Sequence, residues 1–158
     1  MSVSLEFAAL FRRDLTRLTQ ELDSFSDESS LWATSKGIRN AAGTLALHLE
    51  GNLREYIGRQ LGQVPYVRQR DLEFTTRGIS KAELISRIES VRALVVRVIE
   101  AFTPADLDAW YPEAVLKTPV TSRQFLIHLL AHLNYHLGQI DYARRLLTEG
   151  TAIALASV

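Results

Sequence analysis

The sequence contains no cysteine among its 158 residues. This absence excludes disulfide bonds, metal sites built from thiolates and a cysteine nucleophile. It also suits a reducing compartment, and we expect a cytoplasmic protein. Any catalytic or metal-binding chemistry must therefore come from other side chains.

A net charge is also missing, because 18 lysines and arginines balance 18 aspartates and glutamates. A neutral chain has no long-range attraction to nucleic acid or to an anionic membrane surface. The basic pairs Arg12-Arg13 and Arg144-Arg145 have helical spacing among apolar residues, and we interpret them as solvated helix faces. We therefore expect no nucleic-acid partner.

Long apolar runs are absent as well. No stretch approaches the roughly 18 consecutive apolar residues of a transmembrane helix, so we expect no membrane partner. The first apolar run contains Glu6 and precedes its arginines, whereas a signal peptide places its positive charge first. With 47% hydrophobic and 23% charged residues, the composition is that of one globular domain, residues 1–158.

Hydrophobic periodicity predicts an all-α protein with four long helices. In residues 3–22, apolar side chains from Leu5 to Leu22 recur every three or four positions, which is typical of one buried helix face. Turn-forming residues over 23–30 should end this helix. Ser80, with an acidic residue three positions later, predicts a capping box that starts the third helix. The four predicted helices span residues 3–22, 39–61, 80–102 and 121–148, the last of them ending at Gly150.

The connection over residues 62–79 is predicted to be long and irregular, because Gly62, Pro65 and Gly78 oppose a regular helix. In a helical bundle, a connection of this length usually crosses from one end to the other. We therefore predict an up-down-down-up four-helix bundle with the crossover between the second and third helices. The apolar tail over residues 151–158 is expected to dock on the bundle or on a partner chain.

Three of the four histidines point to one metal site. His132 and His136 are four residues apart, so their rings share a helix face with an axial rise of about 6 Å. His48, in the second predicted helix, is the natural third ligand. Three neutral imidazoles that leave a coordination position open describe a catalytic metal site better than a structural one. We predict one divalent transition metal, zinc or nickel in first place and iron as a further possibility, because imidazole suits all of them.

Other polar side chains lie within one turn of these ligands. His128 extends the series, but its ring would be about 12 Å from that of His136 along the axis, so we assign it to packing or to the surroundings of the site. Asn52 follows His48 by four residues and could line a pocket, although a structural amide is the simpler interpretation. Gln139 could hydrogen-bond His136 from outside, or serve a purely structural role.

The predicted crossover carries two acids, Asp71 and Glu73, that could fold over the open end of the site. Charged loop residues are usually solvated, and we predict that both are. The sequence therefore offers no strong general base beside the metal.

The string HLLAHLNYHLGQIDYARRLL resembles the last bundle helix of the DinB-like (YfiT-like) metal-binding proteins, which carry H-x-x-x-H followed closely by G-Q-[IL]. LALHLEGNLREYIG resembles the second helix of that family, which holds the remaining histidine, and RDLEFTTRG resembles a linker of one of its branches. The resemblance implies a four-helix bundle, frequent homodimers and a divalent metal held by His48, His132 and His136. Activities in the wider family include thiol-dependent transferases and isomerases that use low-molecular-weight thiols.

Two functions stay open from the sequence. The first is a metal-dependent enzyme, a thiol-dependent transferase or a hydrolase on a small molecule, in which the metal acidifies a bound water or thiol. The second is a non-catalytic dimeric bundle with a structural or interaction role, whose metal would need a fourth ligand from the crossover or from a second subunit. A role in contacting damaged DNA, suggested only by the family name, is disfavoured by the neutral charge balance.

Overall fold

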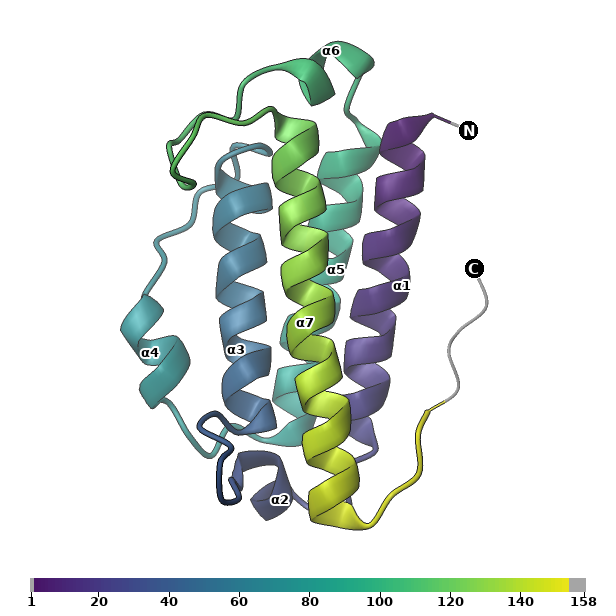
Figure 1. Cartoon of the computed structure of the whole chain (residues 1–158), viewed down its shortest axis with the longest axis vertical. Helices are drawn as coiled ribbons and strands as arrows, with labels where there is room; N and C mark the ends of the chain where they lie inside the picture. Colours follow the sequence, from purple (N-terminus) through teal and green to yellow (C-terminus); the bar gives the residue numbers. More distant parts are fainter. Residues whose placement is uncertain (1, 154–158) are drawn as a thin grey trace.

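Four long helices form the bundle in the computed structural model, which describes residues 2–153. Figure 1 shows α1 and α7 running in one direction along the bundle and α3 and α5 running in the other. The long helices are α1 (Val3–Asp23), α3 (Ala42–Leu53), α5 (Lys81–Glu100) and α7 (Ser122–Thr148). In the described part of the chain, the only β-bridge is an isolated one between Trp110 and Thr121. The predicted all-α four-helix bundle is confirmed.

Side-chain caps stabilise the starts of three of these helices. Ser2 accepts a hydrogen bond from the backbone N–H of Leu5 at the start of α1. Ser80 accepts a hydrogen bond from the backbone N–H of Glu83 at 3.2 Å, so α5 begins where the sequence predicts. A reciprocal capping box joins Thr121 and Gln124 at the start of α7. These bonds satisfy backbone N–H groups that have no partner within the first helical turn.

Apolar side chains of α1 and α5 fill much of the core. In α1 the buried stripe includes Phe7, Phe11, Leu15 and Leu18. Leu5, predicted to lie in this stripe, is 42% exposed. The buried position in the first turn is Ser4, which points about 100° around the helix axis from Leu5. Among residues 2–153, no helix is long and apolar enough to cross a membrane.

The helix α3 is buried on every side, since all of its residues are buried. The helices α5 and α7 pack against it from within the bundle, and the short helix α4 (Arg70–Thr75) packs against it from outside. Polar side chains on such a helix need partners, because burying an unpaired polar group costs free energy. The buried histidine of α3 therefore needs hydrogen-bond partners on the helices that surround it.

Two segments predicted to be irregular contain short helices. The helix α2 (Glu28–Trp32) occupies the predicted turn, with the side chain of Asp27 accepting a hydrogen bond at its N-terminus. The helix α4 lies within the predicted crossover over residues 62–79. Both are too short to show a hydrophobic period, which explains why the sequence pattern misses them. A third short helix, α6 (Pro104–Asp108), precedes α7.

The second long helix does not continue as a regular α-helix to residue 61. It passes into the π-helical segment η1 (Arg54–Arg59), where the backbone N–H of Gln60 bonds to the carbonyl of Glu55, five residues earlier. Such π-helical turns frequently occur near functional sites. Here the segment lies directly after the part of α3 that carries the histidine.

The end of α7 corrects two expectations. Arg144 is only 3% exposed, because it forms a buried ion pair with Glu21 of α1, so it does not belong to a solvated face. The helix ends at Thr148, as predicted, but the left-handed residue that follows it is Glu149, with a φ of 54°, and not Gly150. Of the apolar tail predicted to dock, residues 154–158 lie outside the described residues.

Candidate metal centre

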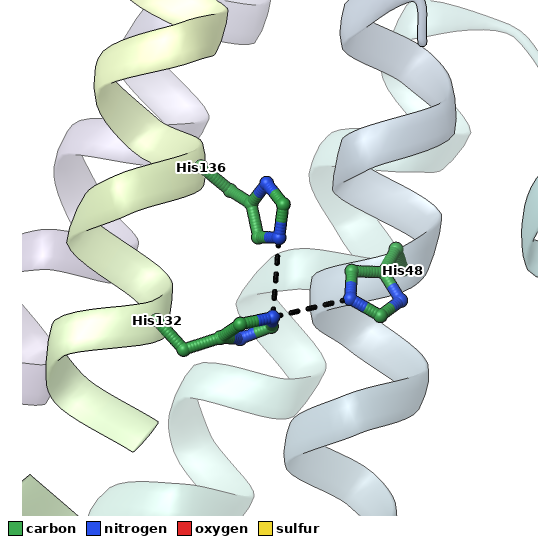
Figure 2. Close-up of side chains that lie close together, drawn as sticks. All are labelled: His48, His132 and His136. Carbon is green, nitrogen blue, oxygen red and sulfur yellow. Dashed lines mark hydrogen bonds between the residues drawn. The ribbon is translucent and has the colours of Figure 1, made fainter. Parts of the chain in front are cut away.

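Three histidines from two facing helices meet between α3 and α7. Figure 2 shows His48 reaching from α3, while His132 and His136 reach from α7. Nε2 of His132 lies 3.2 Å from Nε2 of His48 and 3.1 Å from Nε2 of His136. The structure thus brings together the three histidines that the sequence singles out as ligands.

Hydrogen bonds behind two of the rings determine which nitrogen faces the centre. Nδ1 of His48 lies 2.9 Å from Oε2 of Glu73, and Nδ1 of His136 lies 2.8 Å from Oε1 of Gln139. Both partners are oxygen acceptors, so each Nδ1 carries the proton and donates it. In a neutral ring, Nε2 then directs its lone pair inward. Two lone pairs therefore point toward Nε2 of His132, which has at most one proton to share between them.

The environment of His132 favours its neutral form. Burial first, and then the neighbouring rings of His136 and His48, lower the pKa of His132 to about 4 from its ordinary value of 6.5. Burial also lowers the pKa of His136, although the hydrogen bond to Gln139 opposes this shift. Neutral imidazole is the form that binds a metal, so these rings are available as ligands at neutral pH.

Glu73 fixes the orientation of His48 from the crossover. Its carboxylate is buried and accepts a bidentate pair of bonds from Arg68, Nε to Oε1 at 2.7 Å and Nη2 to Oε2 at 2.9 Å. Burial alone would raise the pKa of Glu73, but the bonds from His48 and Arg68 together lower it. The prediction of a solvated acid is therefore wrong for Glu73, whereas Asp71 is exposed.

Gly51 is the sequence signal that could have revealed this contact. A Cβ atom at Gly51 would lie 2.1 Å from Oε1 of Glu73, so the carboxylate can approach α3 only because residue 51 has no side chain. Glycine inside a helix lowers its stability, and its presence there calls for a packing reason. Phe74, the next residue of α4, also covers the site, with its ring centroid 5.0 Å from that of His48.

The donor set fits a divalent transition metal. In a tetrahedral site with Zn–N bonds of about 2.0–2.1 Å, two ligand nitrogens lie about 3.3–3.4 Å apart. The two Nε2 separations of 3.1 and 3.2 Å are close to this value, and all three ligand atoms lie within 4.8 Å of one another. Carboxylate and amide acceptors behind the rings are the usual supports of metal-binding histidines. The cluster could therefore hold a metal ion, and imidazole donors alone do not select among zinc, nickel and iron.

The other predicted residues lie beside the cluster. A cavity of about 300 Å³ borders His48 and His132, and both Asn52 and His128 line it. His128 is exposed and stacks on Phe125 with ring centroids 5.7 Å apart, so it is not part of the three-histidine cluster. Sequence reasoning did not identify Arg68 or Gly51, because their roles depend on how the crossover packs on α3.

Comparisons with known proteins agree with the helical fold. Residues 5–157 match a family model described as "Protein of unknown function (DUF1572)". A comparison with curated proteins found no match. Similar solved structures include the DinB-like protein YjoA of Bacillus subtilis, a conserved protein of Enterococcus faecalis and a DinB-like protein of Bacillus cereus.

These structures share the fold over nearly the whole chain. The Bacillus subtilis protein is 13% identical with a TM-score of 0.70, and the match covers 95% of this chain and 97% of that one. The Enterococcus faecalis protein is 16% identical with a TM-score of 0.76, covering 95% and 99%. The Bacillus cereus protein is 20% identical with a TM-score of 0.72, covering 96% and 95%. The resemblance to DinB-like proteins found in the sequence is thereby confirmed.

Proposed function

Because this chain belongs to the DUF1572 family and has the DinB-like fold, we propose that it is a metal-dependent enzyme acting on a small molecule. Its ligands to one divalent transition metal are His48, His132 and His136, with zinc or nickel as the first candidates and iron as a further one. One observation carries this proposal. Two Nε2 lone pairs, oriented by Glu73 and Gln139, converge on a third imidazole.

The same hydrogen bonds support an open site over a closed structural one. Both carboxylate oxygens of Glu73 are engaged by Arg68 and His48 on the outer side of the ring. The nearest acid of the crossover is therefore occupied and not free to serve as a fourth ligand. Structural zinc sites usually have four protein ligands, whereas catalytic sites have three and keep a position for water or substrate.

The metal ion would supply the Lewis acid, and the protein residues would hold and orient its ligands. When bound, a divalent ion supplies a Lewis acid that stabilises negative charge on a substrate thiol, a water molecule or a carbonyl oxygen. Three neutral imidazoles leave the charge of the ion undiminished, and Glu73 with Arg68 holds His48 in place. No carboxylate lines the adjacent cavity, so the described residues offer no carboxylate base there.

We place thiol-dependent transfer first and hydrolysis second. We rank thiol-dependent transfer first because the chain resembles thiol-using proteins. This ranking is an analogy with the fold, since the site alone does not distinguish the two reactions. A cytoplasmic location would fit this order, because low-molecular-weight thiols are reduced in that compartment.

The test compares metal-loaded and metal-free protein in two assays. One follows the transfer of mercaptoethanol to chlorodinitrobenzene, and the other follows the hydrolysis of para-nitrophenyl acetate. We expect the metal-loaded protein to accelerate one reaction by about 100-fold or more over the metal-free protein. His132→Ala should abolish the acceleration, while Arg97→Gln, on an exposed position of α5, should retain it. Equal rates with and without metal in both assays would contradict catalysis.

A second candidate is a non-catalytic homodimeric metal-binding bundle. The observation that favours it is an exposed apolar stripe on α7, where Tyr135, Tyr142 and Leu146 are 65–68% exposed. Their spacing of seven and four residues places them on one helix face, and exposed apolar surface often marks an interface. Sedimentation equilibrium checks this directly. Tyr142→Glu should convert a dimer to a monomer, and a wild-type monomer would remove the argument for this candidate.

A further inference from the structure

The space beside the histidine cluster continues as the cavity of about 300 Å³ between α3, α7 and the crossover. Asn52 follows His48 by four residues, one helical turn toward η1 on the same face of α3. Tyr56, a further turn along, meets Phe125 of α7 edge to face, with ring centroids 5.4 Å apart. The cavity therefore has the histidines on one side, an amide in the middle and an aromatic wall beyond it.

The amide oxygen of Asn52 is buried without a partner. The residue is only 7% exposed, and Oδ1 makes no hydrogen bond within residues 2–153. A buried unsatisfied amide oxygen is costly, and native proteins keep such groups mainly where a ligand or water completes them. Because Asn52 lines the cavity, the partner it lacks is most simply supplied from there.

The charged lining of the cavity has one sign. Arg68 and Arg70 line it from the crossover, and no aspartate or glutamate does. Arg68 is already neutralised by its bidentate pair with Glu73. Arg70 has no ion pair within the described chain, and its Cζ lies 5.4 Å above the ring of Phe74, which itself packs against the cluster. An unpaired cation thus stands beside the cavity.

We propose that this cavity is the substrate pocket of the proposed enzyme and that it takes a small organic anion, most simply a carboxylate. Arg70 pairs with the anion, Oδ1 of Asn52 accepts a hydrogen bond from a donor group of the substrate such as a hydroxyl, and the aromatic wall contacts the apolar part. A volume of this size holds on the order of ten non-hydrogen atoms, since a water molecule takes about 30 Å³. The inference rests on the proposed function, because the reacting group of the substrate would face the three histidines.

The test uses protein loaded with Co²⁺ and two thiols of similar length, mercaptopropionate and mercaptoethanol. The chain has no cysteine, so a thiolate-to-cobalt absorption band can come only from the added thiol. We expect the anionic mercaptopropionate to bind about tenfold more tightly than the neutral mercaptoethanol, as a charge-assisted hydrogen bond would give. In Arg70→Gln the two thiols should bind within about twofold of each other, with the cobalt content unchanged. Arg97→Gln, the matched control, should keep the tenfold preference.

The possible results distinguish a failure of the proposed pocket from a failure of the proposed metal site. Equal affinities of the wild type for the two thiols, or a preference that survives Arg70→Gln, would overturn the pocket and leave the metal site intact. If cobalt does not bind, the proposed function fails and the pocket fails with it. If cobalt binds but neither thiol does, thiol-dependent transfer and the pocket fail, and the metal site stays intact.

Asn52→Leu distinguishes a binding role of Asn52 from a structural one. Leucine has the same branched shape and removes an unpaired buried amide oxygen, so the thermal midpoint of the cobalt-loaded protein should not fall. The affinity for mercaptolactate, whose hydroxyl can donate a hydrogen bond to Oδ1, should fall about fivefold, whereas that for mercaptopropionate, which has no donor group, should stay unchanged. A lower midpoint with unchanged affinity for mercaptolactate would make Asn52 a structural residue and remove it from the pocket.

Discussion

The two helix pairs of the bundle are built from different residues. Neither α1 nor α5 contains a glycine or a histidine, and every buried residue of α5 is apolar. By contrast, α3 and α7 hold all four histidines and include glycines at positions 43, 51 and 138. The first pair thus lacks the glycines that lower helix stability, whereas residues that leave space or donate lone pairs are placed in the other. The comparison indicates that α1 and α5 secure the fold while α3 and α7 carry the site.

The largest effect on stability is expected in the first pair. Leu15→Ala removes a fully buried side chain of α1, and it should lower the free energy of unfolding by about 3 kcal/mol. Urea unfolding of the metal-free protein measures this loss. The metal content of the folded variant should equal that of the wild type, because no residue of α1 belongs to the cluster. A loss of metal from the folded Leu15→Ala protein would show that the two pairs are not separable.

The largest effect on metal affinity short of removing a ligand is expected at Glu73. Glu73→Gln keeps the shape of the side chain but removes the charge that orients and polarises His48. Metal affinity should fall by about 10- to 100-fold, as for other outer partners of metal-binding histidines. Competition with a chromophoric chelator measures the change. Glu83→Gln on α5, far from the cluster along the chain, is the control and should leave affinity unchanged.

A matched pair of glycines sharpens the comparison within the second helix pair. Gly51→Ala should lower metal affinity about tenfold, because the new Cβ displaces the carboxylate of Glu73. At Gly138 an added Cβ meets no atom within 4 Å, so Gly138→Ala should raise the free energy of unfolding by about 0.5–1 kcal/mol and leave affinity unchanged. The same titrations and unfolding curves serve both variants. Identical behaviour of the two would remove the proposed reason for Gly51.

The histidine positions were predictable because they depend on local spacing. His132 and His136 share a face of one helix whatever the rest of the chain does. Bringing His48 to them requires only that two long helices pack side by side, and the hydrophobic period predicts both helices. The metal role itself remains a proposal, whereas the meeting of the three rings is a feature of the fold.

Contacts between distant segments were not predictable in the same way. The burial of Glu73 depends on a crossover folding onto α3, and its only local trace is a glycine on the facing helix. The local pattern indicates a solvated Arg144, because the partner that buries it, Glu21, is 123 positions away in the sequence. Helix patterns are set by neighbours in sequence, but the partners of buried charges are set by the packing of the whole chain.

Metal content is the measurement that tests the central claim most directly. The protein is purified without a metal-affinity tag, exposed to zinc or nickel, dialysed and analysed by elemental mass spectrometry. We predict about one metal ion per chain in the wild type and in His128→Ala, and none in His48→Ala or His132→Ala. Metal retained in His132→Ala, or no metal taken up by the wild type, would contradict a three-histidine metal centre.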